Sequence, residues 1–292
     1  MALSENIRTY FEGQWHDSNV PIMKAADHGT WLGTLVFDGA RKFEGVSPDL
    51  DRHCQRVNNS AVTLGLKPTM TTEQLVALCD EGLSQFAEDE AIYIRPMYWS
   101  VDGGPSAVMA DPDSTAFSLC LEALPMPAPE ASATLTTTQF CRPTQASATV
   151  DAKAACLYPN NGRMLREANQ KGFSNALVCD ALGNVAETAT SNIFMVRDGE
   201  VFTPAPNGTF LNGITRQRSL TLLRDNGVIV HESTLTLDDF RQADEVFMTG
   251  NISKVTPVVA FDDRKYEIGK VAKQVREMYW DWAKSRQPAT VS

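Results

Sequence analysis

The sequence has few positive charges for its length, and no segment concentrates them. Of its 292 residues, 26 are Lys or Arg and 36 are Asp or Glu, which gives a formal net charge of −10. A protein that binds the phosphate backbone of a nucleic acid needs clustered cations on its surface. We therefore expect no nucleic-acid partner.

Cysteine and histidine are also sparse, and their spacing fits no metal site. The six cysteines include no C-x-x-C pair, and the four histidines do not stand at ligand spacing with them. We expect reduced thiols and no metal, as in a cytoplasmic protein. No apolar run is long enough to span a bilayer, and the N-terminus lacks a positive segment followed by an apolar core. The sequence thus favours neither membrane insertion nor secretion.

The glycine-rich signatures of nucleotide enzymes are missing. Neither G-x-G-x-x-G nor G-x-x-x-x-G-K-S/T follows a predicted strand, which argues against a Rossmann dehydrogenase and a P-loop enzyme. Strands and helices are predicted without regular alternation, so we expect a mixed α/β or α+β fold. The three prolines within 124–132 indicate a linker between a smaller domain over 1–123 and a larger one over 133–292, which would carry Lys153.

Local patterns predict several elements. Ser47-Pro48-Asp49 resembles a helix start, and an apolar stripe follows at Leu50, Cys54, Val57, Ala61 and Leu64. Thr71-Thr72-Glu73-Gln74 has the form of a capping box at the start of a second helix. Further helices are predicted over 162–171, 215–225 and 271–284. Strands are predicted over 91–99, 116–123, 175–180, 186–196 and 200–203, with a hairpin turn at 198–199.

Lys153 and Glu187 are the strongest candidates for residues that take part in a reaction. A lysine that forms an imine must lose its proton in a partly desolvated pocket, and a cofactor ring that stores electrons benefits from an acid at its nitrogen. The pair therefore suggests a Schiff-base lysine and a carboxylate for a pyridine nitrogen. The chain has ten lysines, and most lysines are solvated surface amines, so the pair alone does not decide between these interpretations.

Three other segments could bind a phosphate if they converge. Asn212-Gly213-Ile214-Thr215-Arg216 has a glycine before a predicted helix, whose first N–H groups can bind an oxyanion. Thr249-Gly250-Asn251 is a glycine turn after a strand, and Arg52 could supply a fixed positive charge. Each is equally compatible with an ordinary turn or a surface ion pair.

Tyr93 and Arg95 are predicted to share one face of a strand, with Ile92 and Ile94 on the other. A phenol beside a guanidinium could receive a carboxylate. An edge strand with an outward polar face explains the pattern equally well, and Pro96 favours an edge or a strand end.

Taken together, these segments resemble the fold-type IV aminotransferases that use pyridoxal phosphate, and among them most closely the branched-chain amino acid aminotransferases. The resemblance runs from about Phe11 to about Ile268. It rests on Val36-Phe37-Asp38-Gly39-Ala40-Arg41, Leu50-Asp51-Arg52, Tyr93-Ile94-Arg95-Pro96, Lys153 with Tyr158, Glu187 with Asn192-Ile193-Phe194, Asn212-Gly213-Ile214-Thr215-Arg216, and 243–250 followed by Val255-Thr256-Pro257.

The resemblance implies a two-domain fold, a homodimer with active sites near the subunit interface, and transamination between an amino donor and a keto acid such as 2-oxoglutarate. Lys153 would form the Schiff base, and Glu187 would hold the pyridinium nitrogen. The phosphate would be held by Arg52, Ile214, Thr215, Gly250 and Asn251, with Tyr158 also contacting the cofactor. Tyr93 and Arg95 would receive substrate carboxylates, and Phe37 or Trp31 would form an apolar wall.

Several departures from the family pattern affect the substrate region more than the cofactor site. Thr188 follows the glutamate where glycine is frequent, and Ser191 stands where branched-chain enzymes often have glutamate. Leu32, beside Trp31, replaces an expected aromatic residue, and Asn251 replaces a common threonine. An (R)-selective amine or D-amino acid transaminase of the same fold therefore stays open, as do a 4-amino-4-deoxychorismate lyase and a carrier without activity. The lyases usually have asparagine and arginine soon after the lysine, and this chain has neither there.

Overall fold

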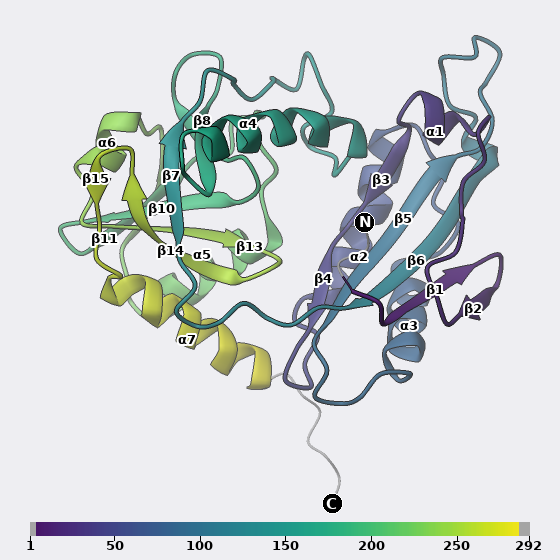
Figure 1. The fold of residues 1–292 in the computed structure, drawn as a ribbon, viewed down its shortest axis with the longest axis horizontal. Helices are drawn as coiled ribbons and strands as arrows, with labels where there is room; N and C mark the ends of the chain where they lie inside the picture. The colour runs from purple at the N-terminus through teal and green to yellow at the C-terminus, as the bar shows by residue number, and fades with distance from the viewer. Residues whose placement is uncertain (1–3, 286–292) are drawn as a thin grey trace, which may run out of the picture. The chain divides into compact units, whose positions relative to one another are not determined.

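The protein, described over residues 4–285 by a computed structural model, consists of two compact units (Figure 1). The first contains the chain up to residue 126 together with 151–156, and the second contains 127–150 and the chain from 157 onward. The break at 126 falls within the predicted linker. Lys153, however, belongs to the first unit and not to the C-terminal one, because backbone hydrogen bonds join it to Phe37 and Ser60.

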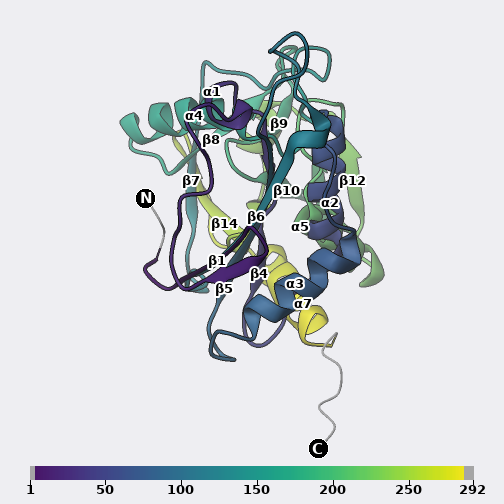
Figure 2. The same ribbon diagram turned by 90° about the vertical axis from the view of Figure 1, so that its right-hand side faces the viewer.

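The first unit is built on a six-stranded antiparallel sheet with the strand order β2-β1-β6-β5-β3, in which β4 also pairs with β5. Helices α2 (Leu50–Thr63) and α3 (Thr72–Leu83) lie on the same side of this sheet, as Figures 1 and 2 both show, and α1 (His28–Trp31) is a single turn. The strands are β1 (Ile7–Phe11), β2 (Gln14–His16), β3 (Leu35–Phe37), β4 (Ala40–Lys42), β5 (Ile92–Ser100) and β6 (Thr115–Ala123).

The two long helices of this unit begin differently. In α3 the predicted capping box is present: Gln74 N donates to Thr71 Oγ1 at 3.2 Å, and Thr71 N donates to Gln74 Oε1 at 2.8 Å. The predicted start of α2 at Pro48 is wrong, because Asp49 has a left-handed φ of 56° and such a residue cannot belong to a right-handed helix. The predicted apolar stripe is buried at Leu50, Cys54, Val57 and Ala61.

The second unit contains a nine-stranded sheet. Eight strands follow the order β12-β11-β10-β13-β14-β7-β8-β9, and the ninth, β15, pairs with β14. Three pairs are parallel, β7 with β8, β7 with β14, and β11 with β12. The strands are β7 (Ala133–Thr137), β8 (Asn175–Cys179), β9 (Val185–Thr188), β10 (Asn192–Arg197), β11 (Glu200–Pro204), β12 (Val230–Ser233), β13 (Glu245–Gly250), β14 (Lys254–Phe261) and β15 (Arg264–Lys265). The helices are α4 (Tyr158–Gln170), α5 (Ile214–Asp225), α6 (Leu237–Arg241) and α7 (Lys270–Ser285).

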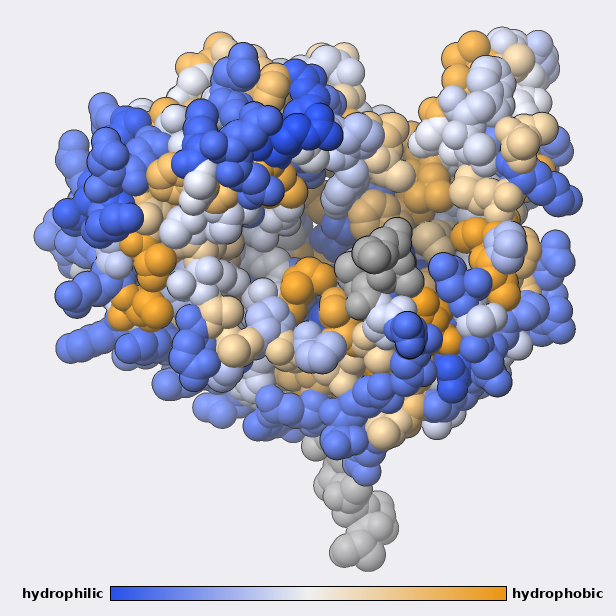
Figure 3. Space-filling view, in the orientation of Figure 1, coloured by the Kyte–Doolittle hydropathy of each residue, from blue (hydrophilic) through white to orange (hydrophobic). Residues whose placement is uncertain are grey.

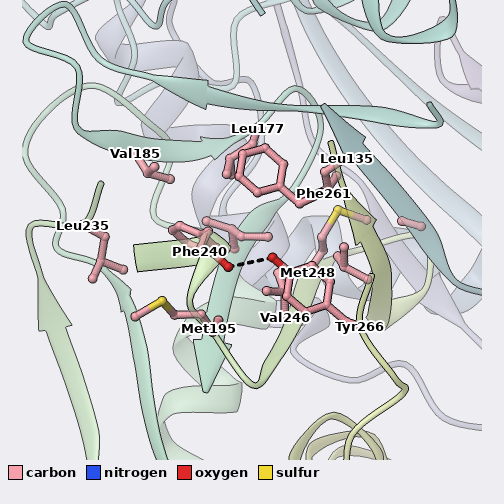
Figure 4. Close-up of a cluster of buried hydrophobic side chains, with 14 residues drawn as sticks. Leu135, Leu177, Val185, Met195, Leu235, Phe240, Val246, Met248, Phe261 and Tyr266 are labelled. Atoms are coloured by element: carbon pink, nitrogen blue, oxygen red, sulfur yellow. Dashed lines mark hydrogen bonds between the residues drawn. The ribbon is translucent and has the colours of Figure 1, made fainter. Parts of the chain in front are cut away.

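Strand β10 is buried on both faces. Its residues alternate between two clusters of apolar side chains, as the period of a strand requires. The first cluster, drawn in Figure 4, surrounds Phe240 and Tyr266, whose hydroxyl donates to the Phe240 carbonyl at 2.6 Å. The second cluster packs against α5 and α7. This double packing fixes β10, and with it Asn192 at its start.

The strand predicted over 186–196 is interrupted, because Thr188 closes a tight turn. Its N–H and its hydroxyl both donate to the Ser191 carbonyl at 2.8 Å, and Ser191 N donates to Thr188 Oγ1 at 2.9 Å. The turn leaves Glu187 near the end of β9 and Asn192 at the start of β10. The hairpin predicted at 198–199 is present, with both residues at positive φ.

Polar side chains cover most of the face seen in Figure 3, densely over the outer side of α4. Within residues 4–285, no helix is both long enough and apolar enough for a membrane span. The same part of the chain contains no group of three or more His, Cys, Asp or Glu side chains that could hold a metal ion.

Candidate active site

Lys153 lies in a short segment that adds to the edge of the first unit. Its N–H donates to Ser60 Oγ at 3.0 Å, its carbonyl accepts from Phe37 N at 3.1 Å, and Ala154 forms a bridge with Val36. These backbone bonds hold the segment without using the lysine side chain. Its Nζ stands 5.0 Å from the centroid of the Phe37 ring, in a partly buried position. Partial burial beside an aromatic face is a setting in which a lysine can serve as a nucleophile.

A buried cation lies opposite Tyr93. Arg41 of β4 pairs in register with Tyr93 of β5, and its side chain is fully buried. Its Nη2 donates to the Leu124 carbonyl, but Nε and Nη1 have no hydrogen-bond partner among the described residues. Burial, partly opposed by Tyr93, lowers the pKa of Arg41 to about 10, so the group stays charged at neutral pH. Two donor nitrogens without an acceptor on a buried cation suit a carboxylate.

Gly39 leaves the space that Tyr93 occupies. A Cβ at position 39 would lie 2.4 Å from the Tyr93 hydroxyl oxygen. Burial raises the pKa of the Tyr93 phenol, although the nearby charges of Lys153 and Arg95 oppose this, so the phenol keeps its proton and can donate. Arg95 stacks over the Tyr93 ring at 4.9 Å but also pairs with Glu122 at 2.9 Å. Tyr93 and Arg95 thus lie together as predicted, and Arg95 divides its contacts between the Tyr93 ring and the Glu122 carboxylate.

Asp38, directly after Phe37, is the centre of a buried polar cluster. Arg56 of α2 donates to both carboxylate oxygens, at 2.6 and 2.8 Å, and His53 Nδ1 and Gly39 N donate to Oδ1 at 2.7 Å each. Burial alone would raise the pKa of Asp38, but the charge and hydrogen bonds of Arg56 and His53 outweigh it and hold the pKa well below its usual range. The cluster ties the Phe37–Gly39 corner to α2.

Replacing Asp38 with asparagine is expected to lower the free energy of unfolding by about 3 kcal/mol at pH 7, because it removes a fully buried carboxylate from the mostly buried Arg56, whose side chain is 16% exposed. A carboxylate with a depressed folded pKa stabilises fully above its unfolded pKa of about 3.9 and loses that contribution as pH falls toward the folded value. The wild-type advantage in urea unfolding should thus shrink as the pH falls below about 4.

The matched control is Asp113→Asn, which removes an exposed ion pair with Lys67 (2.8 Å) and should leave unfolding unchanged. An advantage of Asp38 that stays constant into the acid range would contradict the assignment.

Two other predicted residues of this unit lie nearer the surface. Trp31 is 59% exposed, with its ring 6.0 Å from that of His28. The Arg52 side chain is 33% exposed and stands 3.7 Å from Asp49, which is a long ion pair. Arg56, one turn further along α2, is the arginine that binds Asp38. Residues four apart share a helix face, so both arginines lie on the same side of α2.

In the second unit, both oxygens of Glu187 are held. Arg142 Nη2 lies 3.1 Å from Oε1, and Asn192 Nδ2 donates to Oε2 at 3.2 Å. Arg142 is itself fixed, because Nη1 donates to Asn161 Oδ1 at 2.9 Å and Nε donates to the Thr209 carbonyl at 3.2 Å. Sequence reasoning missed Arg142, since nothing near it in the chain indicates its partner. The carboxylate is therefore fixed in orientation.

Asn192 connects this carboxylate to the start of α5. Its Oδ1 accepts from Gly213 N at 3.1 Å, and its Nδ2 also donates to the Leu211 carbonyl at 3.0 Å. A Cβ at Gly213 would stand 2.2 Å from Asn192 Oδ1, so the close approach requires glycine. Helix α5 then begins at Ile214 without a side-chain cap. The first N–H groups of a helix have no intrahelical partner and attract anions.

The glycine turn lies beside the same strand. Asn192 of β10 pairs directly with Thr249 of β13, and Gly250 ends that strand. Thr249 Oγ1 and Asn251 Nδ2 are buried and have no hydrogen-bond partner within residues 4–285. A Cβ on Gly250 would approach Ser191 Oγ to 2.8 Å. The unit therefore brings together Glu187, the start of α5 and the glycine turn. Tyr158, 37% exposed, begins α4, the helix that also contains Asn161.

Comparison with known proteins identifies the family. The family described as amino-transferase class IV matches residues 35–261. The chain belongs to this family. This class IV aminotransferase is 61% identical to an aminotransferase from Brucella abortus whose crystal structure contains the co-factor PLP, with a TM-score of 0.94 over 95% of this chain and 99% of that one. The expected family and enzyme class are confirmed.

The names of more distant relatives state a substrate class. The aminotransferase is 29% identical over 287 residues to a probable branched-chain-amino-acid aminotransferase of Aquifex aeolicus, covering 93% of this chain and 91% of the relative. The structure of the branched-chain aminotransferase from Thermoproteus uzoniensis with norvaline is 26% identical, with a TM-score of 0.87 over 96% of this chain and 95% of that one. The expected two-domain fold of the aminotransferase is confirmed.

Proposed function

We propose that this aminotransferase uses pyridoxal phosphate to exchange an amino group between a branched-chain amino acid and a 2-oxo acid such as 2-oxoglutarate. The observation that carries the proposal is the framework of the second unit, in which one asparagine, Asn192, joins a fixed carboxylate to the start of α5 and to the glycine turn after β13. The 61% identity to a PLP-bound aminotransferase supports the cofactor, and the names of the more distant relatives support the substrate class.

The donors of the second unit fit the cofactor. The unpartnered Asn251 Nδ2, the hydroxyl of Thr215 and the N–H groups at Ile214, Thr215 and Gly250 offer a phosphate hydrogen bonds. Glu187, held by Arg142 and Asn192, is proposed to accept a hydrogen bond from the protonated ring nitrogen. Tyr158 is proposed to contact the cofactor, and Arg52 of the first unit to add positive charge at the phosphate.

When bound, the cofactor supplies an aldehyde and a ring that accepts electrons. Lys153 would supply the amine for that aldehyde and would carry a proton to and from the substrate α-carbon. Tyr93 is proposed to receive the substrate α-carboxylate beside the positive charge of the buried Arg41, whose Nε and Nη1 have no hydrogen-bond acceptor within residues 4–285. Phe37 and Trp31 provide apolar surface for an aliphatic side chain.

A second candidate, transamination of an (R)-amine or a D-amino acid, is favoured by one observation. Arg95, the proposed receptor for the side-chain carboxylate of glutamate, already pairs with Glu122 at 2.9 Å. A shared cation binds a second carboxylate less strongly, which weakens the argument for glutamate as one of the two substrates.

The test is a half-reaction screen on the PLP-loaded enzyme, following the cofactor absorbance. Leucine, isoleucine, valine and glutamate should each react at least about tenfold faster than D-alanine or (R)-1-phenylethylamine, a difference that one mismatched contact can produce. A response confined to D-alanine or the amine would replace the substrate assignment and keep transamination. Pyruvate release from 4-amino-4-deoxychorismate would instead indicate a lyase.

We also propose that the enzyme is a homodimer, as the resemblance to the family implies, and that it is cytoplasmic, as the cysteine pattern suggests. Sedimentation of the purified chain at micromolar concentration measures the oligomeric state directly, and a monomer of 32.1 kDa would contradict the homodimer.

A further inference from the structure

Lys254 is a fully buried lysine at the glycine turn. It is the first residue of β14, pairs in register with Gly250, and has a left-handed φ of 61°. Burial of an ammonium group is costly, and a left-handed backbone is uncommon for a residue other than glycine. Because both features are unfavourable, the contacts of Lys254 have to compensate for them.

The ammonium group contacts the side chain of the turn. Lys254 Nζ donates to Asn251 Oδ1 at 2.8 Å and stands 5.8 Å from the centroid of the ring of Tyr279, a buried residue of α7. These contacts hold the lysine between α7 and the turn. They also direct its positive charge toward the segment of Gly250 and Asn251.

This contact fixes which way the Asn251 amide faces. An ammonium group can only donate, so the amide must turn its oxygen, and not its nitrogen, toward Lys254. The amide nitrogen, Nδ2, then points to the other side of the planar group. There it is buried and meets no hydrogen-bond acceptor within residues 4–285. A buried donor left without an acceptor destabilises a protein by about 1–3 kcal/mol, a cost that a bound acceptor removes.

We propose that Lys254 is a positioning residue for the cofactor phosphate: it holds the Asn251 amide so that Nδ2 donates to a phosphate oxygen, and its buried charge favours that anion. The inference rests on the proposed function and extends it by naming a side-chain donor and the residue that orients it. The neighbouring Thr249 Oγ1 is also buried and without a hydrogen-bond partner within residues 4–285.

The test compares ligands with and without a phosphate. The full-length protein is stripped of cofactor and titrated with pyridoxal phosphate and with pyridoxal, following absorbance. Lys254→Met should weaken pyridoxal phosphate binding about 10- to 100-fold, the range of one hydrogen bond to a charged group, and change pyridoxal binding less than twofold. Lys254→Arg, which keeps the charge and the donor, should recover most of the affinity. Lys265→Met, at an exposed lysine of β15, should behave as wild type.

A double-mutant cycle then tests whether Lys254 acts through Asn251. In an Asn251→Ala background, Lys254→Met should weaken pyridoxal phosphate binding by a clearly smaller factor than in the wild-type background, since the amide to be oriented is gone and only the charge of Lys254 is lost. An equal factor in the two backgrounds would contradict a role through Asn251. Asn251→Asp, which substitutes an acceptor for the donor, should weaken phosphate binding more than Asn251→Ala does. Thermal unfolding of each cofactor-free variant reports its folding, and the Arg and Asn251 variants carry the test if Lys254→Met does not fold.

The possible failures are distinguishable. A wild-type protein that binds no pyridoxal phosphate would overturn the proposed function and this inference with it. A wild-type protein that prefers pyridoxal phosphate to pyridoxal, with folded Lys254→Met binding both as well as wild type, would overturn only the role of Lys254. An equal loss for both ligands would assign Lys254 to the general packing of the turn and overturn its role at the phosphate.

Discussion

Replacing Lys153 with alanine is expected to lower the rate of amino-group transfer by at least about 10⁴-fold, because the residue is proposed to be both the nucleophile and the proton carrier at the α-carbon. The fold should survive, since the contacts with Ser60 and Phe37 are made by the backbone. Single-turnover absorbance with leucine measures the rate, and borohydride should fix the cofactor to the wild-type chain only.

Two further measurements test whether the reaction needs the amine of Lys153 or only its positive charge. Lys153→Arg keeps a cation but does not release a proton at physiological pH, so it should be as inactive as the alanine variant. A small external amine should restore part of the turnover of Lys153→Ala and none of that of Lys153→Arg, in which the space remains filled. Lys24→Ala, at an exposed lysine, should retain full activity. Wild-type turnover in Lys153→Ala would remove the lysine from the mechanism.

Elements whose signals are local could be predicted from the sequence. The capping box at Thr71 and the turn at 198–199 depend on residues next to each other in the chain, and both are present. The start of α2 was missed because Asp49 adopts a left-handed conformation that the favourable Ser-Pro-Asp pattern conceals. The break after Thr188 was missed because the apolar run continues through it, while the turn is closed by hydrogen bonds between Thr188 and Ser191.

In the candidate site, too, the residues with local sequence signals could be predicted and their distant partners could not. Motifs pointed to Lys153, Glu187 and the two glycine turns, because each carries its chemistry in a short stretch. The groups that orient them come from elsewhere in the chain: Ser60 lies 93 residues from Lys153, and Arg142 has its partner 45 residues later, at Glu187. Whether an arginine is buried and paired is decided by tertiary packing, and spacing along the chain carries no signal of it.

Replacing Glu187 with glutamine is expected to lower kcat about 10²- to 10³-fold with little change in KM, the loss typical when one preorganised electrostatic partner of the reacting system is removed. The proposed role is to hold the protonated ring nitrogen, and a neutral amide of the same size cannot supply the charge. The substitution also leaves Arg142 buried without a counter-charge, so the free energy of unfolding should fall by about 3 kcal/mol. Half-reaction kinetics with leucine and urea unfolding measure the two effects.

Glu245, a half-buried carboxylate, provides a control that distinguishes a loss of catalysis from a loss of stability. Glu245 accepts from the N–H groups of Val271 and Ala272 at the start of α7, at 3.0 and 3.3 Å, and it has no proposed part in the reaction. Glu245→Gln should lower the stability of the second unit and leave kcat unchanged. If both variants lost turnover in proportion to stability, Glu187 would be a structural residue. A loss of kcat confined to Glu187→Gln, at a temperature where both variants are folded, assigns the carboxylate to the chemistry of the ring nitrogen.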